Sequence, residues 1–163
     1  MSAPHNDLPT ALSLAGSAVD GQVVRALERA GLPGLRPRHG YVVQRLLSGP
    51  KTATEIAEAL GVSQQAVSKT VKEMVALGYV QQACDPVDRR RRPVELSERG
   101  RQAVDVARRT RSSLARQLGT RVGEERLTVA HEVVAELLGL LGLDEPVRRR
   151  AVPPPDGTDP GGR

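Results

Sequence analysis

The sequence predicts a mainly α-helical protein with a small β-wing: a winged helix-turn-helix flanked by N- and C-terminal dimerisation helices. Three observations predict this fold class. Two stretches with helical periodicity, 52–60 and 63–74, are separated by Gly61, and glycine ends helices by adopting a left-handed backbone. Two alternating segments then enclose an arginine-rich turn. Apolar residues recur at helical spacing near both ends of the chain.

The N-terminal part is predicted to form two helices after a disordered start. Residues 1–9 mix polar residues with two prolines, so we expect no regular structure there. Apolar residues then recur at helical spacing to about residue 30, and Gly-Leu-Pro-Gly follows, which assigns 10–34 to an N-terminal dimerisation helix and its break. A second helix is expected over 38–47, ahead of Gly49-Pro50.

The helix-turn-helix is predicted to begin at Thr52, which forms a capping-box signature with Glu55. Ser63 is placed to cap the second helix by accepting a backbone N–H. One side of that helix is apolar, whereas the other carries amides, a hydroxyl and cations with no carboxylate before Glu73. The apolar side comprises Ala66, Val67, Thr70, Val71 and Met74, and the polar side comprises Gln64, Gln65, Ser68, Lys69 and Lys72.

A β-hairpin is expected next, with strands at 79–83 and 94–96. The intervening loop has a turn at Asp85-Pro86 and four consecutive arginines, 89–92, which repel one another unless they meet an anion. A charge run alone is usually a solvated surface. Directly after a helix-turn-helix, it favours DNA as the anion.

Side-chain chemistry favours double-stranded DNA as the partner. Amides bond base edges in pairs and lysines neutralise phosphates, although an ordinary solvated helix face is the alternative interpretation. Residues 85–116 hold ten arginines and five acids, a surplus equal to the whole net charge of +5. Phe and Trp are absent and there are two tyrosines, so the chain has few of the rings that stack on single-stranded bases.

Two further helices are expected after the hairpin. Ser97 caps a long helix that should break near Gly119, and a last helix runs from Gly123 to about Leu141. The last helix has a broad apolar stripe, which needs a partner surface and so predicts a homodimer built from both terminal regions. The stripe consists of Leu127, Ala130, Val134, Leu137, Leu138 and Leu141.

These elements divide the chain into functional regions. Residues 35–100 form the predicted DNA-binding domain and 101–143 the C-terminal dimerisation helices. The tail, 144–163, is rich in proline, glycine and arginine and is expected to be disordered.

The helix-turn-helix and wing motifs resemble those of the MarR family of bacterial transcriptional regulators. The resemblance covers about a third of the chain, LGVSQQAVSKTVKEMVALGYV followed by DPVDRRRRPVELSERG. It implies a dimeric, ligand-responsive repressor that binds a pseudo-palindromic operator. The matching residues are Ala57, Gly61 and Val67, the wing pattern Asp85-Pro86-x-Asp88-x-Arg90, and the exit Leu96-Ser97-x-x-Gly100.

In such a dimer the second helix of each helix-turn-helix, the recognition helix, enters a major groove, with half-sites roughly 34–36 Å apart. The candidates for reading base edges are Gln64, Gln65, Ser68 and Lys69, and those for phosphate contact are Ser63 and Lys72. In the wing the resemblance implies that Asp88 steadies the tip, that Arg90 enters the minor groove and that Arg89 and Arg91 contact the backbone.

Three residues carry further hypotheses. In MarR-family relatives the helix that holds His39 and Tyr41 borders an effector crevice, which makes both candidates for binding a small-molecule effector. An interior, hydrogen-bonded histidine is the alternative for His39. Cys84 follows the first strand, and a redox sensor is weighed there against a structural cysteine.

Other classes of protein are disfavoured. The sequence has no spacing of carboxylates, nucleophiles or metal ligands typical of an enzyme, so no catalytic residue, metal or cofactor is expected. It lacks a membrane-length apolar run and a signal-peptide pattern, which predicts a cytoplasmic protein. The competing function is a winged-helix module that docks on an acidic protein partner.

Overall fold

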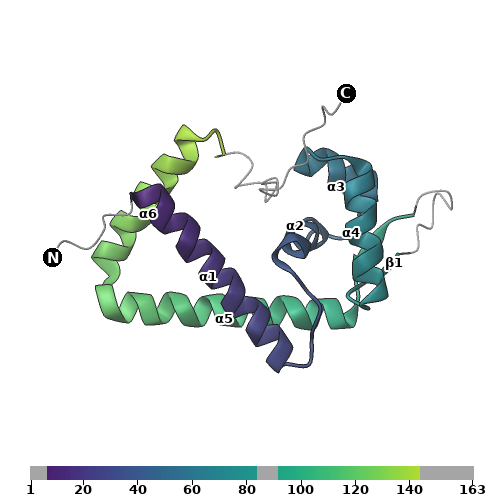
Figure 1. The fold of residues 1–163 in the computed structure, drawn as a ribbon, viewed down its shortest axis with the longest axis horizontal. Helices are drawn as coiled ribbons and strands as arrows, with labels where there is room; N and C mark the ends of the chain where they lie inside the picture. Colours follow the sequence, from purple (N-terminus) through teal and green to yellow (C-terminus); the bar gives the residue numbers. More distant parts are fainter. Residues whose placement is uncertain (1–6, 84–91, 144–163) are drawn as a thin grey trace.

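The computed structural model describes residues 7–83 and 92–143. It confirms the mainly α-helical fold with a small two-stranded wing. Figure 1 shows α2, α3, α4 and the hairpin gathered at one end of the long helix α5, while α1 crosses α5 and α6 lies at its other end. The elements are α1 (Leu8–Arg29), α2 (Pro37–Leu46), α3 (Ala53–Leu60), α4 (Gln64–Ala76), β1 (Val80–Gln82), β2 (Val94–Leu96), α5 (Glu98–Val122) and α6 (Glu124–Leu140).

The predicted caps of the helix-turn-helix are confirmed. Thr52 Oγ1 accepts the Glu55 N–H at 3.2 Å, and Glu55 Oε2 accepts the Thr52 N–H at 2.7 Å. Gly61 has a φ of 64°, in the left-handed region, and Ser63 Oγ accepts the Ala66 N–H at 3.2 Å. Because each helix end is satisfied locally, the sequence itself sets where α3 ends and α4 begins.

The wing is anchored to the helices on one side. β1 and β2 pair antiparallel, with Val80 opposite Leu96. Val94 also forms a bridge with Lys51, in the segment between α2 and α3, through N–H···O bonds of 3.0 and 2.8 Å. Residues 79 and 83, expected in the first strand, lie just outside β1, although the Tyr79 carbonyl accepts the Ser97 N–H and the Ala83 N–H donates to the Pro93 carbonyl.

One hydrophobic core joins all elements except α6. Its most deeply buried large side chains are those of Ile56, Met74, Tyr79 and Val80, which come from α3, α4 and the start of the wing. α1 contributes Val23 and Leu27, whereas α6 has no buried residue. The helix-turn-helix and the base of the wing therefore share one core with α1, α2 and α5, whereas Val129, Val133, Leu140 and Leu141 on or after α6 remain exposed.

Two expectations about helix ends are wrong. α1 begins at Leu8 instead of residue 10, because the Asp7 carboxylate accepts the Thr10 N–H at 3.0 Å and Pro9 is compatible with a first helical turn. α5 continues through Gly119, since a helical glycine costs only about 1 kcal/mol. Gly123, with a φ of 83°, ends α5 instead. Within the described ranges none of the helices has the length and hydropathy that crossing a membrane requires.

Candidate nucleic-acid interface

The polar face of α4 is the candidate site for DNA. Val67, Val71 and Met74 hold the opposite face of the helix in the core. The polar side chains predicted to contact DNA therefore point outward: those of Gln64, Gln65, Ser68, Lys69 and Lys72. Of these, Ser68 is half-buried and the others are exposed. They surround one shallow hollow, lined by Gln64, Gln65, Ser68, Lys69, Lys72 and Glu73.

Ser63 lies at the N-terminal end of this face. Its side chain caps α4, and the backbone N–H groups of the first turn give this end of the helix a partial positive charge. Ser63 and the two lysines therefore place positive potential at both ends of the run of amides. This arrangement suits a polyanion whose bases are read between two phosphate contacts.

Glu73 is the acid at the edge of this face, and α2 holds it in place. Arg38 Nη2 lies 2.6 Å from Glu73 Oε2, and His39 Nε2 lies 3.3 Å from the same oxygen. The hydrogen bond from Arg38, followed by that from His39, lowers the pKa of Glu73, so its carboxylate stays ionised. Because Arg38 balances the negative charge of Glu73, Lys69 and Lys72 make the net charge of the polar face of α4 positive.

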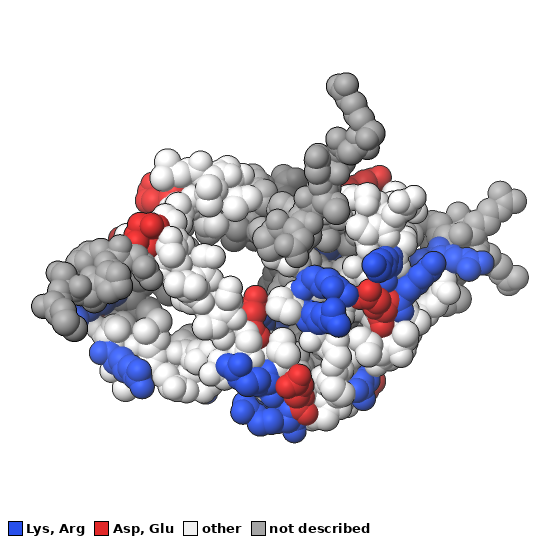
Figure 2. All heavy atoms as spheres, in the orientation of Figure 1, with Lys and Arg blue, Asp and Glu red and all other residues white. Residues whose placement is uncertain are grey.

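The wing tip lies outside the described residues. This applies to the predicted DNA contacts Asp88, Arg89, Arg90 and Arg91 and to Cys84. At the base of the wing, Gln81 Nε2 donates to Glu95 Oε1 at 2.9 Å. Figure 2 shows basic side chains gathered mainly over the half of the molecule that holds α2–α4, with acidic side chains interspersed.

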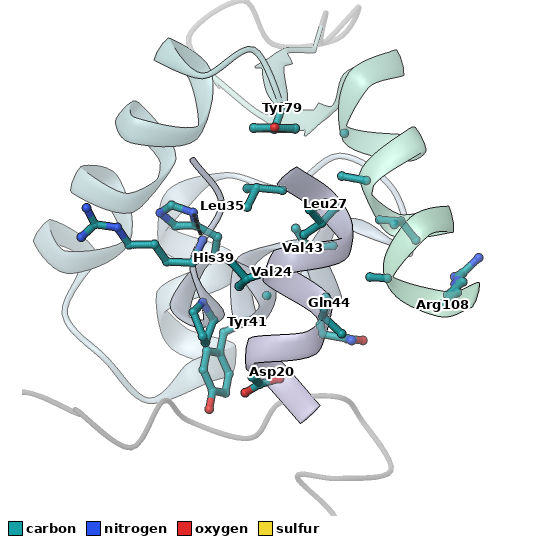
Figure 3. Close-up of a pocket in the computed structure, with 18 of the residues that line it drawn as sticks. Asp20, Val24, Leu27, Leu35, His39, Tyr41, Val43, Gln44, Tyr79 and Arg108 are labelled. Atoms are coloured by element: carbon teal, nitrogen blue, oxygen red, sulfur yellow. Dashed lines mark hydrogen bonds between the residues drawn. The ribbon is translucent and has the colours of Figure 1, made fainter. Parts of the chain in front are cut away.

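A cavity of about 280 Å³ lies between α1, α2 and α5. His39 and Tyr41, the two predicted effector residues, both line it. Figure 3 shows His39 and Arg108 on opposite sides of α1, with Tyr79 at one end and Asp20 and Tyr41 at the other. Its apolar lining includes Val23, Val24, Leu27, Leu35, Val43, Leu47, Ala103, Val104 and Ala107.

His39 is also a hydrogen-bonded interior residue, with 2% of its surface exposed. Its Nδ1 accepts the Arg36 N–H at 3.2 Å, which caps α2, and its Nε2 faces Glu73. This pattern assigns the proton to Nε2 of a neutral ring. Burial lowers the pKa of His39, and the hydrogen bond to Glu73 opposes that effect.

Sequence reasoning missed the contacts that join α2 to α4. Arg38 and Glu73 are 35 residues apart, and no sequence motif includes both. It also missed Tyr79, whose hydroxyl donates to the Pro33 carbonyl at 2.8 Å and whose ring lies 4.9 Å from the Arg99 guanidinium carbon. No local sequence pattern predicts either contact, because each joins residues that are far apart in the sequence and meet only in the folded protein.

Residues 34–91 match the sequence model of the MarR family. Among curated proteins, none matches the chain. Among solved structures, the transcriptional regulator Tm0710 from Thermotoga maritima is similar in fold, with a TM-score of 0.56 and 23% identity. That match covers 80% of this chain and 91% of Tm0710.

Two of the similar structures contain DNA. The transcriptional repressor CouR, bound to a 23-mer duplex, matches with a TM-score of 0.60 and 21% identity over 80% of this chain and 92% of CouR. A mutant of S. aureus MepR bound to an oligodeoxyribonucleotide matches with a TM-score of 0.57 and 16% identity over 84% and 99% of the two chains. At these sequence identities, the similarity to both proteins shows a shared fold alone.

Proposed function

We propose that this chain, whose residues 34–91 match the MarR family model, is a dimeric winged-helix transcription repressor of that family that binds a pseudo-palindromic operator. The observation that carries the proposal is the exposed face of α4, where amides and two lysines follow a capped, electropositive helix end. The amides and Lys69 would discriminate base edges in the major groove, whereas Lys72 would supply affinity through a phosphate. Sequence selection from a random duplex pool tests it directly.

A second copy of this chain is the proposed partner of the exposed apolar surface at the far end of α5 from α4. α6 has no buried residue, and Leu140 is 85% exposed. Such a helix is stable when a partner covers its apolar side, and the apolar side chains of α1 offer a second surface for it. The exposed apolar residues are Leu8 and Leu14 on α1, Leu118 on α5, and Val129, Val133, Leu140 and Leu141 on or after α6.

Replacing Val129 and Val133 together by lysine is expected to raise the dimer dissociation constant at least about 100-fold, because each buried valine contributes about 1.5 kcal/mol or more. Sedimentation velocity at micromolar concentration measures the change. The control is Glu125→Lys, which adds positive charge to the same helix without removing an apolar side chain. A double variant that still sediments as the wild type does would contradict an α6 interface.

Gln65→Ala and Arg90→Ala are expected to have different effects on DNA binding. Loss of the Gln65 amide should change the preferred base at one position, because bidentate amide contacts discriminate adenine by about 1–3 kcal/mol. Arg90→Ala should weaken binding to most sequences alike, as expected for an arginine in the minor groove. Titrations against the selected operator and a scrambled duplex separate the two. Unaltered affinity of Arg90→Ala would remove the wing from the interface.

The proposed effector is a small molecule with an apolar body that enters the cavity between α1, α2 and α5. The apolar lining supports this assignment, and Arg108 and Arg111 at the α5 side favour a polar or anionic end. Arg111 Nη2 lies 3.4 Å from Asp20 Oδ1, which partly balances its charge. Challenge of the protein–operator complex with a small-molecule library, read by fluorescence anisotropy, tests whether such a ligand releases DNA.

A further inference from the structure

We propose that His39 is a positioning residue that couples the cavity to the recognition helix α4 through Glu73, and that a proton on its imidazole weakens DNA binding. This inference rests on the proposed function, because it names the route by which a change in the cavity reaches the DNA-facing surface. The proton is the simplest ligand that tests the route, since it needs no identified effector.

His39 lies between the cavity and helix α4. It lines the cavity, where a ligand would touch it, and its Nε2 lies 3.3 Å from Glu73 Oε2 on α4. Glu73 in turn belongs to the hollow formed by the DNA-facing side chains. His39 therefore both lines the cavity and contacts the helix proposed to read DNA.

The hydrogen bonds of His39 require a neutral ring. Nδ1 accepts the Arg36 N–H, so a proton on Nδ1 would place two donors face to face. That bond caps the first turn of α2, from which Arg38 reaches Glu73 at 2.6 Å. Protonation would thus break the cap of α2 and strengthen the attraction of the ring to Glu73, moving the first turn of α2 relative to α4.

Burial and nearby charged groups shift the pKa of His39. Burial, Arg38 and Arg36 lower its pKa, whereas Glu73 raises it, and the net effect lies below the ordinary value of 6.5. When folding lowers the pKa of a group, its full contribution to the free energy of unfolding is present above its unfolded-state pKa. That contribution is lost as the pH falls from 6.5 toward the folded-state pKa of His39. The other titratable groups that line the cavity are Asp20 of α1, Tyr41 of α2, Tyr79 after α4, and Arg108 and Arg111 of α5.

The reading of bases depends closely on the position of α4. Side chains that read DNA must stay within about 0.5 Å of the productive geometry. Arg38 and His39 are the α2 side chains bonded to Glu73, so their displacement changes how α4 is held. Acidification should therefore weaken DNA binding, although added positive charge alone would strengthen it.

The experiment compares the full-length wild type with His39→Gln and His39→Asn between pH 7.5 and 5.5. Glutamine keeps an N–H donor for Glu73, asparagine keeps an acceptor for the Arg36 N–H, and neither titrates in this range. Operator affinity is one readout, and the backbone amide NMR shifts of Gln64 and Gln65 in the absence of DNA are the other. Those amides lie about two helical turns from Glu73, so they report movement of the helix. Thermal unfolding at each pH establishes that every sample is folded.

In the wild type the two amide shifts should follow one titration below pH 6.5, and operator affinity should fall about fivefold or more relative to either variant. Equal pH responses of the wild type and both variants would overturn the coupling, since His5 and His131 remain in all three. A wild type without affinity for any duplex at low salt would refute the proposed function instead. The amide shifts would still decide whether His39 moves α4.

Discussion

Replacing Gly100 by alanine is expected to lower the free energy of unfolding by about 3 kcal/mol or more. Gly100 lies in the first turn of α5, where a Cβ would stand 2.1 Å from the Tyr79 carbonyl oxygen and 3.3 Å from Leu96 Cδ2. The Tyr79 oxygen cannot withdraw without losing the Ser97 N–H, which it accepts at 3.1 Å. The close approach joins α5 to the base of the wing, so relief of the clash would displace both.

Urea denaturation followed by circular dichroism measures this change, and Gly119→Ala is the matched control on the same helix. A Cβ at Gly119 would meet Leu127 Cδ2 at 3.8 Å, an ordinary contact. Alanine is a better helix former, so the control should gain about 0.5–1 kcal/mol. A Gly100→Ala protein as stable as the wild type would show that α5 does not approach Tyr79 so closely.

Replacing Lys69 and Lys72 together by alanine is expected to lower operator affinity about 100-fold. Lys69 is proposed to read a base edge and Lys72 to contact a phosphate, and a charged contact of either kind is worth about 1.5 kcal/mol or more, about tenfold in affinity. Loss of the Lys72 contact should reduce the slope of log affinity against log salt by about 0.9, because each neutralised phosphate contributes about that amount. Both lysines border the hollow on α4, and α2 already balances Glu73.

Fluorescence anisotropy from 50 to 300 mM salt measures both effects, with Arg109→Ala/Arg126→Ala as the control. That variant removes the same charge from α5 and α6, so a general loss of positive charge would affect the two variants equally. An unchanged salt slope in the lysine variant would place the phosphates elsewhere. A docking site for an acidic protein would show no preference for the operator over a scrambled duplex, which separates that alternative from DNA reading.

Local chemistry accounts for the parts of the fold that could be predicted. The capping box at Thr52, the left-handed Gly61 and the cap at Ser63 all act within three or four residues, so the boundaries of α3 and α4 followed from the sequence. The same holds for the outward face of α4, because helical periodicity alone separates it from Val67, Val71 and Met74.

Local chemistry also explains the errors. Glycine is a weak helix former, which predicts a break at Gly119, but it costs only about 1 kcal/mol inside a helix. The end of α5 is instead the positive-φ Gly123. At the N-terminus, the prolines predict disorder, although Pro9 fits the first turn that Asp7 caps. In both cases the residue type was compatible with two backbone states, and its neighbours decided between them.

By itself, the sequence determined the order of the helices, the caps of the helix-turn-helix and the amide and lysine face of α4. Only the tertiary structure decided that Arg38 and His39 hold Glu73, that a cavity lies behind His39, and that Gly100 meets the Tyr79 carbonyl. The physical reason is range: caps and periodicity act over a few residues along the chain, whereas these contacts join residues 21 to 35 positions apart that only the packed fold brings together.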